Sequence, residues 1–564
     1  MSNEPELAKV SPFAGRQAQM FPKLTPAQIA FLERYGRNIT TEQRQILAEP
    51  GDRRPMFVVL SGSIEVVQVS LNGEVPVTVH TPGSFTGEMS TLRGAAGVVR
   101  MRVREPGEVV AIDEKALRAI IQTNAELSEL FMRAFILRRV GLIDSQSGDV
   151  VLLGSTHSAG TLRLQQFLTR NGFPYVNLDV DQDSSVQGLL EHFHVKLEDI
   201  PVVLCRGAVV LKNPSNEEVA ACLGMNVQID DARVRDMIVI GAGPAGLAAA
   251  VYGASEGLDV AVLETGTPGG QAGSSSRIEN YLGFPTGISG LALAGRALVQ
   301  AQKFGAEIRT AYTALRLHCQ ERPYAIEYGH EQVVRAKTLI VATGAEYRQL
   351  GLPSASRFVG MGIYYAATST EAKRCAAAEI IVVGGGNSAG QAAVFLAGTS
   401  RWVHLLVRSS GLAASMSQYL IRRIEQTPNI TLHVSTEITA LDGDAQLERV
   451  TWKSSGAAGG SGVPETHAIG HVFLMTGAAP ATHWLNGCIA LNDKGFIRTG
   501  SDLTAADLAP ERWPQPRQPQ FFETSIPGVF AVGDVRCGSI KRVAAAVGEG
   551  SACVQQVHRV LGAL

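Results

Sequence analysis

The sequence contains few cysteines, and none of them lies close enough to another to form a CxxC motif. Seven occur in 564 residues, at positions 205, 222, 319, 375, 488, 537 and 553, and no two of them form a CxxC motif. Their spacing matches no zinc-ligand pattern, so we expect no metal site. It also gives no sign of a disulfide framework, so we expect reduced thiols and a cytoplasmic location.

Long apolar runs and an excess of charge of one sign are missing as well. The nearest approach to a membrane span, 237–254, is interrupted by Pro244 and three glycines, and the N-terminal residues MSNEPELAKV lack a charged-then-apolar signal. Lys and Arg number 50 against 52 Asp and Glu, a net charge of −2. We therefore expect neither a membrane anchor nor a nucleic-acid partner.

Glycine, in contrast, is abundant, at 59 of 564 residues. A chain of this length holds about four domains. Alternating β-branched segments within 25–112 predict a small β-roll, and a periodic segment at 113–140 predicts a helix. Strands and helices alternate over 150–228, which predicts a small α/β unit, and the chain from Arg235 onward reads as Gly-rich α/β.

The segment MIVIGAGPAGLAAAVYGA, which starts at Met237, is typical of a dinucleotide-binding turn. Gly241, Gly243 and Gly246 form GxGxxG between an apolar strand and a predicted helix, so backbone N–H groups at the helix start can face a pyrophosphate. The next strand ends in Glu264, 23 residues after Gly241, where a carboxylate accepts hydrogen bonds from ribose hydroxyls. These residues predict a bound dinucleotide.

Over about 330 residues from Arg235 to the C-terminus, the sequence resembles the thioredoxin reductase family of flavoproteins. The motifs that carry the resemblance, in order, are Gly269-Gly270-Gln271, Ile278-Glu279-Asn280-Tyr281, Ala342-Thr343-Gly344-Ala345, Leu350-Gly351-Leu352-Pro353 and Gly528-Val529-Phe530-Ala531-Val532-Gly533-Asp534. The resemblance implies FAD, with Asp534 on the ribityl chain and Arg542-Val543-Ala544 against the isoalloxazine. The FAD contacts would fall on Gly241, Gly243, Ala245, Gly246, Glu264, Gly270, Gln271, Asn280, Ala342, Thr343, Gly344, Gly533, Asp534, Arg542, Val543 and Ala544.

A second strand-turn-helix segment, EIIVVGGGNSAGQAAVFLA from Glu379, carries GxGxxA spacing. The resemblance places NADPH here, in a domain inserted between the two halves of the flavin domain, with contacts at Gly384, Gly386, Asn387, Ser388, Ala389, Arg408 and Ser409. Where the family has an HRR triplet for the 2′-phosphate, only Arg408 remains, followed by two serines. One guanidinium and two hydroxyls can still hold a phosphate, so NADPH is favoured over NADH without the sequence deciding between them.

The departure that bears on mechanism is the segment GIYYAATSTEA at 362–372. Aligned with the family, its two redox cysteines become Ala366 and Ser369. A methyl group or a hydroxyl cannot attack a disulfide, so the internal relay from flavin to dithiol is absent. Cys375, which stands alone six residues further on, is expected to be a buried helical cysteine.

The 150–228 segment resembles the thioredoxin or glutaredoxin fold, with Ile200-Pro201-Val202 where that fold has its cis-proline loop. Its CxxC positions are Ser158-Ala159-Gly160-Thr161, preceded by His157. A dithiol function is therefore not expected. A structural spacer, a docking surface and a vestige remain open as roles, and His157 is a weak candidate acid or base.

The N-terminal β-roll resembles the cyclic-nucleotide-binding domain family over about 100 residues, mainly through Ser84-Phe85-Thr86-Gly87-Glu88-Met89-Ser90. In that family the Gly-Glu begins a short helix that takes the cyclic phosphate, and the Glu accepts from the ribose hydroxyl, which makes Gly87, Glu88 and Ser90 candidate contacts. The Arg that neutralises the phosphate is replaced by Gly97, and only Arg93, Arg100 and Arg102 are near enough in sequence to substitute for it.

The sequence thus predicts an α/β protein with two Rossmann-like domains for FAD and NAD(P)H, preceded by a β-roll domain and a thioredoxin-like domain. The expected boundaries are 1–148, 149–230, 235–351 with 476–564 for FAD, and 352–475 for NAD(P)H. We expect a homodimeric NAD(P)H oxidoreductase that passes electrons through flavin to an external acceptor, which is a small molecule or a protein such as a thioredoxin. The alternatives are a nucleotide- and redox-responsive flavoprotein sensor and a flavin-binding scaffold without turnover.

Overall fold

The structure is a computed structural model of the 564-residue chain. It describes residues 17–70, 73–88, 91, 97, 99–144, 150–155, 158–181, 196, 199–205, 209–225, 232–320, 322–329, 332–348, 350–455, 462–485 and 487–563. These residues fall into two compact units. The first comprises those within 1–154, 167–229 and 299–311, and the second those within 155–166, 230–298 and 312–564.

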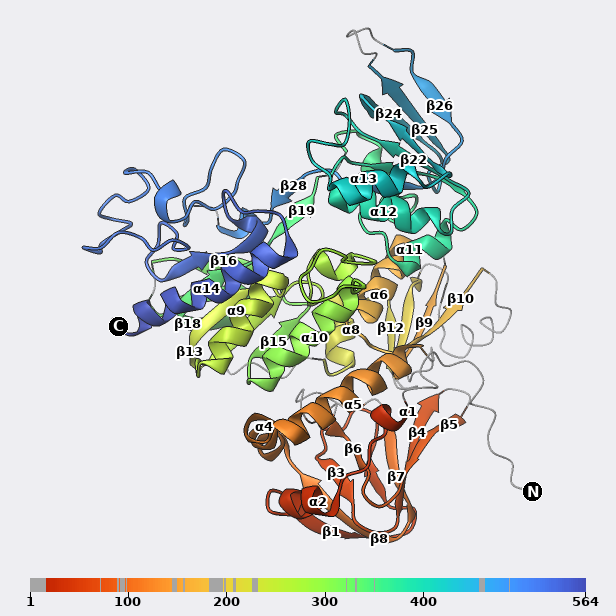
Figure 1. The fold of residues 1–564 in the computed structure, drawn as a ribbon, viewed down its shortest axis with the longest axis vertical. Helices are drawn as coiled ribbons and strands as arrows, with labels where there is room; N and C mark the ends of the chain where they lie inside the picture. Colours follow the sequence, from red (N-terminus) through yellow and green to blue (C-terminus); the bar gives the residue numbers. More distant parts are fainter. Residues whose placement is uncertain are drawn as a thin grey trace. The chain divides into compact units, whose positions relative to one another are not determined.

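The N-terminal residues form a β-roll of two four-stranded sheets, in the orders β1-β8-β3-β6 and β2-β7-β4-β5 (Figure 1). Its core includes Phe85, which meets Phe131 edge to face at 4.8 Å between ring centroids. The elements are α1 (Gln17–Met20), α2 (Pro26–Glu33), β1 (Arg37–Thr41), β2 (Ile46–Ala48), β3 (Met56–Val59), β4 (Ser63–Ser70), β5 (Gly73–His80), β6 (Phe85–Thr86), β7 (Arg100–Glu105), β8 (Gly107–Ile112), α4 (Glu114–Thr123) and α5 (Ala125–Asp144).

The single helix predicted at 113–140 is wrong, because the structure has two helices there. Asp113 caps the first by accepting a hydrogen bond from the backbone N–H of Ala116 at 2.8 Å. Asn124 then takes an extended conformation, and its side-chain oxygen accepts from the N–H of Leu127 at 3.0 Å. A side chain that caps a new helix competes with continuation of the old one, so the apolar periodicity runs across a break.

The middle residues form a four-stranded sheet of order β10-β9-β11-β12, with β10 parallel and β11 antiparallel to β9. The peptide bond between Ile200 and Pro201 is cis, which confirms the predicted cis-proline loop. The elements are β9 (Val150–Gly154), α6 (Ala159–Arg170), β10 (Val176–Asp179), β11 (Val202–Cys205), β12 (Val209–Lys212) and α8 (Asn216–Cys222).

The first Rossmann subdomain has a seven-stranded sheet of order β15-β14-β13-β18-β17-β16, with β29 paired to β18. Strands β14, β13, β18 and β29 are parallel, and helices α9 and α14 run side by side along it (Figure 1). Its elements are β13 (Val234–Ile240), α9 (Pro244–Ser255), β14 (Val260–Glu264), α10 (Gly290–Lys303), β15 (Glu307–Thr310), β16 (Ala314–His318), β17 (Tyr324–Tyr328), β18 (Gln332–Val341), β29 (Val529–Ala531) and α14 (Val543–Leu561).

The second Rossmann subdomain has a parallel sheet of order β20-β27-β21-β22-β23 and an antiparallel sheet β24-β25-β26. The chain enters through β19 and leaves through β28, which pair with each other (Figure 1). The elements are β19 (Ala345–Tyr347), β20 (Ile363–Tyr364), α11 (Ser369–Arg374), β21 (Glu379–Val383), α12 (Asn387–Ala397), β22 (Trp402–Leu406), α13 (Gln418–Glu425), β23 (Ile430–His433), β24 (Thr436–Asp442), β25 (Arg449–Ser454), β26 (Glu465–His467), β27 (Val472–Leu474) and β28 (Ala478–Pro480).

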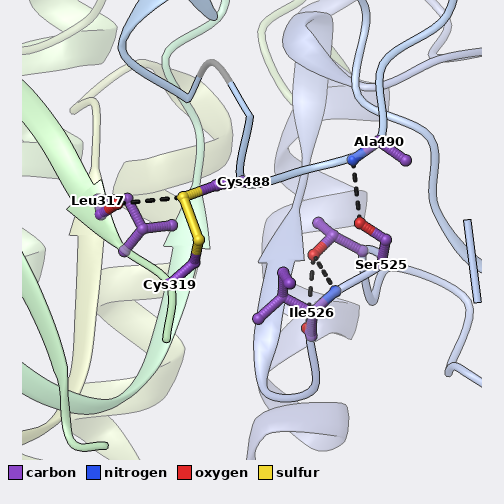
Figure 2. The surroundings of a disulfide bond; sticks show 7 residues. Leu317, Cys319, Cys488, Ala490, Ser525 and Ile526 are labelled. Atoms are coloured by element: carbon purple, nitrogen blue, oxygen red, sulfur yellow. Dashed lines mark hydrogen bonds between the residues drawn. A yellow bond between two sulfur atoms is a disulfide. The ribbon is translucent and has the colours of Figure 1, made fainter. Parts of the chain in front are cut away.

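A disulfide joins Cys319 and Cys488 (Figure 2). Cys319 follows β16, Cys488 lies in the segment after β28, and their Cα atoms are 5.8 Å apart, as in an ordinary disulfide. The expectation of reduced thiols is therefore wrong for these two cysteines. They are separated by 169 residues, and only the return of the chain from the inserted subdomain brings them together, which no spacing rule reveals.

Two further properties concern the described part of the chain. No helix in it is both long and apolar enough to cross a membrane. Its His, Cys, Asp and Glu side chains also form no group of three or more that could hold a metal ion.

Candidate cofactor-binding sites

Four parallel strands of the first Rossmann subdomain end at one edge of the sheet. Strand β13 ends at Ile240, β14 at Glu264, β18 at Val341 and β29 at Ala531. The residues predicted for the dinucleotide follow these ends directly, so the topology brings together motifs that lie almost 300 residues apart in the sequence. In open α/β sheets this edge is where nucleotide ligands bind.

The glycine turn after β13 leaves no room for side chains. Gly241 has φ of +103°, in the left-handed region, and a Cβ added at Gly246 would overlap the carbonyl oxygen of Gly241. At Gly243, the N-cap of α9, the only atom within 4 Å of an added Cβ is the Cα of Gly270, at 3.9 Å. The backbone at the start of α9 is therefore closed on its inner side and accessible at Gly243, as a pyrophosphate requires.

Glu264 holds this turn together. Its Oε2 accepts a hydrogen bond from the N–H of Ala242 at 2.6 Å, and its Oε1 accepts from the N–H of Gly266 at 2.9 Å. The carboxylate is therefore oriented at the end of β14, where the sequence predicts contact with a ribose.

Asp534 lies at the same edge. It follows Gly533, where an added Cβ would come within 2.9 Å of the Cβ of Ala245 in α9. Burial raises the pKa of Asp534, although the nearby Lys541 acts in the opposite direction. The carboxylate of Asp534 makes no hydrogen bond to any other residue that the structure describes. A desolvated acceptor without a partner is a position where ligand hydroxyl groups would supply the missing hydrogen bonds.

The other predicted flavin residues surround this edge. The side-chain amide of Gln271 donates to the carbonyl of Ala345, and Thr343 Oγ1 donates to the carbonyl of Ala481 at 2.9 Å. Asn280, Arg542 and Ala544 are exposed, and Val543 is half-buried. Gly270 and Ala342 lie against the turn, Ala245 is in α9 beside it, and Ala245 and Ala342 are buried. Gly344, with φ of +67°, follows Ala342 by two residues. Together these groups form a cradle that fits FAD.

The second Rossmann subdomain repeats the glycine turn. Gly384 has φ of +144°, Gly386 is the N-cap of α12, and Ala389 is fully buried beneath the turn. Asn387 is turned inward, because its Oδ1 accepts from the N–H of Ser417 at 2.8 Å. Ser388 is the second residue of α12, beside these turn residues. This arrangement fits a second dinucleotide at the end of β21.

Arg408 and Ser409 follow the end of the neighbouring strand β22. Both are exposed, and Ser409 Oγ donates to the carbonyl of Gly411 at 2.7 Å. Among the residues that the structure describes, no carboxylate pairs with Arg408. Its guanidinium thus remains available to a ligand phosphate.

The segment aligned with the family's dithiol belongs to the second Rossmann subdomain and contacts the first. Ala367 forms a parallel β-bridge with Ser275, which follows the turn at Gln271. Ala366 is half-buried. Thr368 is the N-cap of α11, and Ser369 is the first residue of that helix. Cys375 is fully buried, as predicted, but it is the C-cap of α11 and does not lie within the helix. Burial raises the pKa of its thiol, so the thiol is protonated and unreactive.

In the candidate nucleotide site of the β-roll, the predicted carboxylate already has a protein partner. Glu88 is 3% exposed, and both of its carboxylate oxygens accept from Arg138 Nη1 of α5, at 2.9 and 3.0 Å. Gly87, which precedes Glu88, has φ of +89°, a conformation that glycine adopts more readily than other residues. Ser90 and Arg93 lie outside the described residues.

The two remaining candidates for the missing phosphate arginine also have protein partners. Arg100 forms ion pairs with Glu49 and Glu74, and Arg102 with Glu65 and Glu74. These carboxylates lie on or beside neighbouring strands of the roll, and hydrogen bonds to them raise the pKa of both arginines. The described residues therefore leave neither of these two guanidinium groups free for a cyclic phosphate.

In the predicted thioredoxin-like segment, the side chain of Ser158 caps α6 by accepting a hydrogen bond from the N–H of Thr161 at 3.3 Å. His157 lies outside the described residues. Sequence reasoning missed Arg138 and Lys541 as partners of predicted site residues. Arg138 is 50 residues from Glu88, and no local pattern links them. Lys541 is seven residues from Asp534 and donates to its carbonyl oxygen, a proximity that the sequence could have indicated.

Two Rossmann subdomains, with one inserted into the other and with glycine turns facing the carboxyl ends of their strands, define a dinucleotide-dependent oxidoreductase. A family model described as pyridine nucleotide-disulphide oxidoreductase matches residues 235–550, more than half of the chain. The chain therefore belongs to this family. A cyclic nucleotide-binding domain model matches residues 39–124, so an N-terminal domain of that kind precedes the oxidoreductase.

Thioredoxin reductases are among the relatives of the C-terminal part. That of Bacillus subtilis is 29% identical over 335 residues, which are 58% of this chain and 96% of the relative. That of Listeria monocytogenes is 30% identical over 333 residues, 58% and 94% of the two chains. The crystal structure of the Lactococcus lactis enzyme in its FR conformation matches with a TM-score of 0.51 and 26% identity, over 58% of this chain and all of that one. The protein is thus an oxidoreductase that resembles thioredoxin reductase in its FAD and NAD(P)H domains.

Proposed function

We propose that the protein transfers electrons from NADPH through FAD to an acceptor outside its own chain, and that it does so without a dithiol relay. The observation that carries this proposal is the identity of the residues where the second subdomain contacts the first. The family's two cysteines align with Ala366 and Ser369, and Ala367 between them pairs directly with Ser275 of the first subdomain. Residues 362–372 align with the family's dithiol segment but contain no cysteine.

The FAD would be held by the glycine turn at the start of α9, by Glu264 and by Asp534. A bound flavin supplies hydride acceptance from nicotinamide and electron delivery to the acceptor. The protein would contribute orientation: the N–H groups at the start of α9 would hold the pyrophosphate, and the carboxylate of Asp534, which has no hydrogen-bond partner among the described residues, would accept hydrogen bonds from ligand hydroxyls. The exposed N-terminus of α14, at Arg542, favours negative charge nearby.

NADPH is proposed over NADH because of Arg408. Its exposed guanidinium follows β22, close to the glycine turn at Gly384, and none of the described carboxylates neutralises it. An unpaired Arg at this edge provides a charge-assisted contact for a 2′-phosphate. NADH offers no group for that contact.

Small diffusible acceptors, such as a quinone or oxygen, fit these features better than a disulfide protein. A disulfide acceptor needs a thiolate to attack it, and Cys375, the one cysteine close to the segment, is buried with a raised pKa. The pairing of Glu88 with Arg138 likewise favours electron transfer over nucleotide sensing as the main activity. The carboxylate that would bind a ribose hydroxyl is already hydrogen-bonded to Arg138.

Steady-state assays with the flavin-loaded protein test this proposal. We expect NADPH oxidation to be supported by a soluble quinone and to remain at background with oxidised thioredoxin as the sole acceptor. Thioredoxin reduction at a rate comparable to that of a dithiol-bearing relative, abolished by removal of FAD, would contradict the proposal.

A further inference from the structure

Helix α6 buries side chains on two different faces. With about 3.6 residues per turn, Ala159, Leu162 and Gln166 share one face, and Leu164 and Leu168 share another. Leu164 and Leu168 are fully buried, and Leu162 is 4% exposed. A helix that covered only its own sheet would need one apolar stripe. The second apolar stripe of α6 must therefore pack against another part of the chain.

That partner is the segment aligned with the missing dithiol. Leu162 belongs to the apolar core of the second Rossmann subdomain, in a cluster with Tyr364, Ala367 and Phe473. Residues Ser155–Gln166 accordingly belong to the same compact unit as the second Rossmann subdomain and most of the first.

A polar contact reinforces the apolar one. Gln166 Nε2 donates to Glu371 Oε1 at 2.6 Å. Glu371 is fully buried in α11, and its other oxygen accepts from the N–H of Thr368 at 2.8 Å and from the Thr368 hydroxyl. Gln166 thus provides a hydrogen-bond donor to an oxygen that is shielded from water.

The backbone is equally close at the start of the helix. Gly360 has φ of +77°, and a Cβ added there would lie 3.0 Å from the Cβ and 3.1 Å from the Cα of Ala159. The turn before β20 therefore accommodates α6 only because residue 360 has no side chain.

We propose that the first two turns of α6 are a built-in cover over residues 366–371, and that this cover occupies the surface on which a partner redox protein would have to dock to reach the aligned dithiol positions. The segment is enclosed on one side by Ser275 and on another by α6. This inference rests on the proposed function, because it explains why the acceptor is a molecule that reaches the flavin without docking here. It also assigns a role to a thioredoxin-like helix that has lost its cysteines.

Hydrogen exchange on the full-length, flavin-loaded protein tests the cover directly. The readout is the exchange rate of peptides spanning 360–374. Gln166→Glu replaces the hydrogen-bond donor to buried Glu371 with a carboxylate, and Leu162→Ala removes apolar atoms from the contact. We expect roughly tenfold faster exchange in each, because the first variant leaves a buried acceptor without its donor and the second leaves a cavity. Leu164→Ala is the matched control, because Leu164 is a buried leucine of the same helix that lies on the opposite face from Leu162. Unchanged exchange in α9 shows that the fold is retained.

A second measurement adds oxidised bacterial thioredoxin to the wild-type protein. We expect no additional protection of residues 360–374. The inference is overturned if both interface variants exchange at the wild-type rate, or if thioredoxin protects this segment in the intact chain. Neither readout requires hydride transfer, so failure of the proposed function and failure of the cover are distinguishable.

Discussion

Glu88 and Arg138 form a buried ion pair in the N-terminal β-roll, with Arg138 Nη1 2.9 Å from one carboxylate oxygen and 3.0 Å from the other. Arg138 also stacks on Phe85, with its guanidinium carbon 4.7 Å from the ring centroid. The side chain that would bind a ribose hydroxyl is thus part of the packing between the roll and α5. A nucleotide that used Glu88 would have to displace an arginine that is itself desolvated.

Cyclic mononucleotides should therefore bind weakly. The phosphate arginine is absent, and the loss of one charge-assisted hydrogen bond costs about 1.5–3 kcal/mol, or roughly 10- to 150-fold in affinity. Equilibrium dialysis with labelled cAMP and cGMP should therefore show no saturable binding at micromolar concentration. Saturable binding at micromolar concentration would show that the Glu88–Arg138 pair opens.

His80 should make the β-roll sensitive to acid. Burial, with the charges of Arg138 and Lys23, lowers the pKa of His80 from its ordinary value to about 3. Below pH 6.5 the unfolded chain binds a proton that the folded roll does not, so stability is lost as the pH falls, by about 2 kcal/mol at pH 5. Because all four tryptophans lie beyond residue 400, native-state hydrogen exchange of β3 is the measurement. His80→Gln should remove this difference between pH 7 and pH 5, and an undiminished difference would contradict the assignment.

Gly246→Ala should abolish flavin retention, because the added Cβ would overlap the carbonyl oxygen of Gly241 and open the turn at α9. The check is the ratio of flavin to protein absorbance after purification. Gly295→Ala is the control: it lies in helix α10, an added Cβ there meets nothing within 4 Å, and it should retain flavin. Equal flavin content in both variants would contradict the cradle.

The Cys319–Cys488 disulfide predicts a thiol count. The structure has five of the seven cysteines as thiols, so the denatured, unreduced chain should titrate five thiols and the reduced chain seven. Closing a loop of 169 residues stabilises a fold by about 2–5 kcal/mol, so the Cys319→Ser/Cys488→Ser variant should unfold at lower denaturant concentration. Seven thiols without reductant would mean that the bond does not form.

Local patterns were sufficient to predict the two Rossmann subdomains. Gly241, Gly246 and Gly384 mark turns whose geometry excludes side chains, and such constraints are visible in sequence because only glycine meets them. Contacts that arise when distant segments meet were not predicted. The Cys319–Cys488 disulfide and the Gln166–Glu371 hydrogen bond, between residues 205 positions apart, follow from chain topology. The same holds for the pairing of Arg138 with Glu88.

Anaerobic spectral titration of the flavin-loaded protein with NADPH tests the central claim most directly. With Ala366 and Ser369 in the dithiol positions, no disulfide at those positions can take a second pair of electrons from the flavin. One equivalent of NADPH per flavin should therefore bleach it fully, and NADH should require a higher concentration. A dithiol-bearing relative would need two equivalents. A requirement for two equivalents, or a flavin that neither coenzyme reduces, would contradict the account.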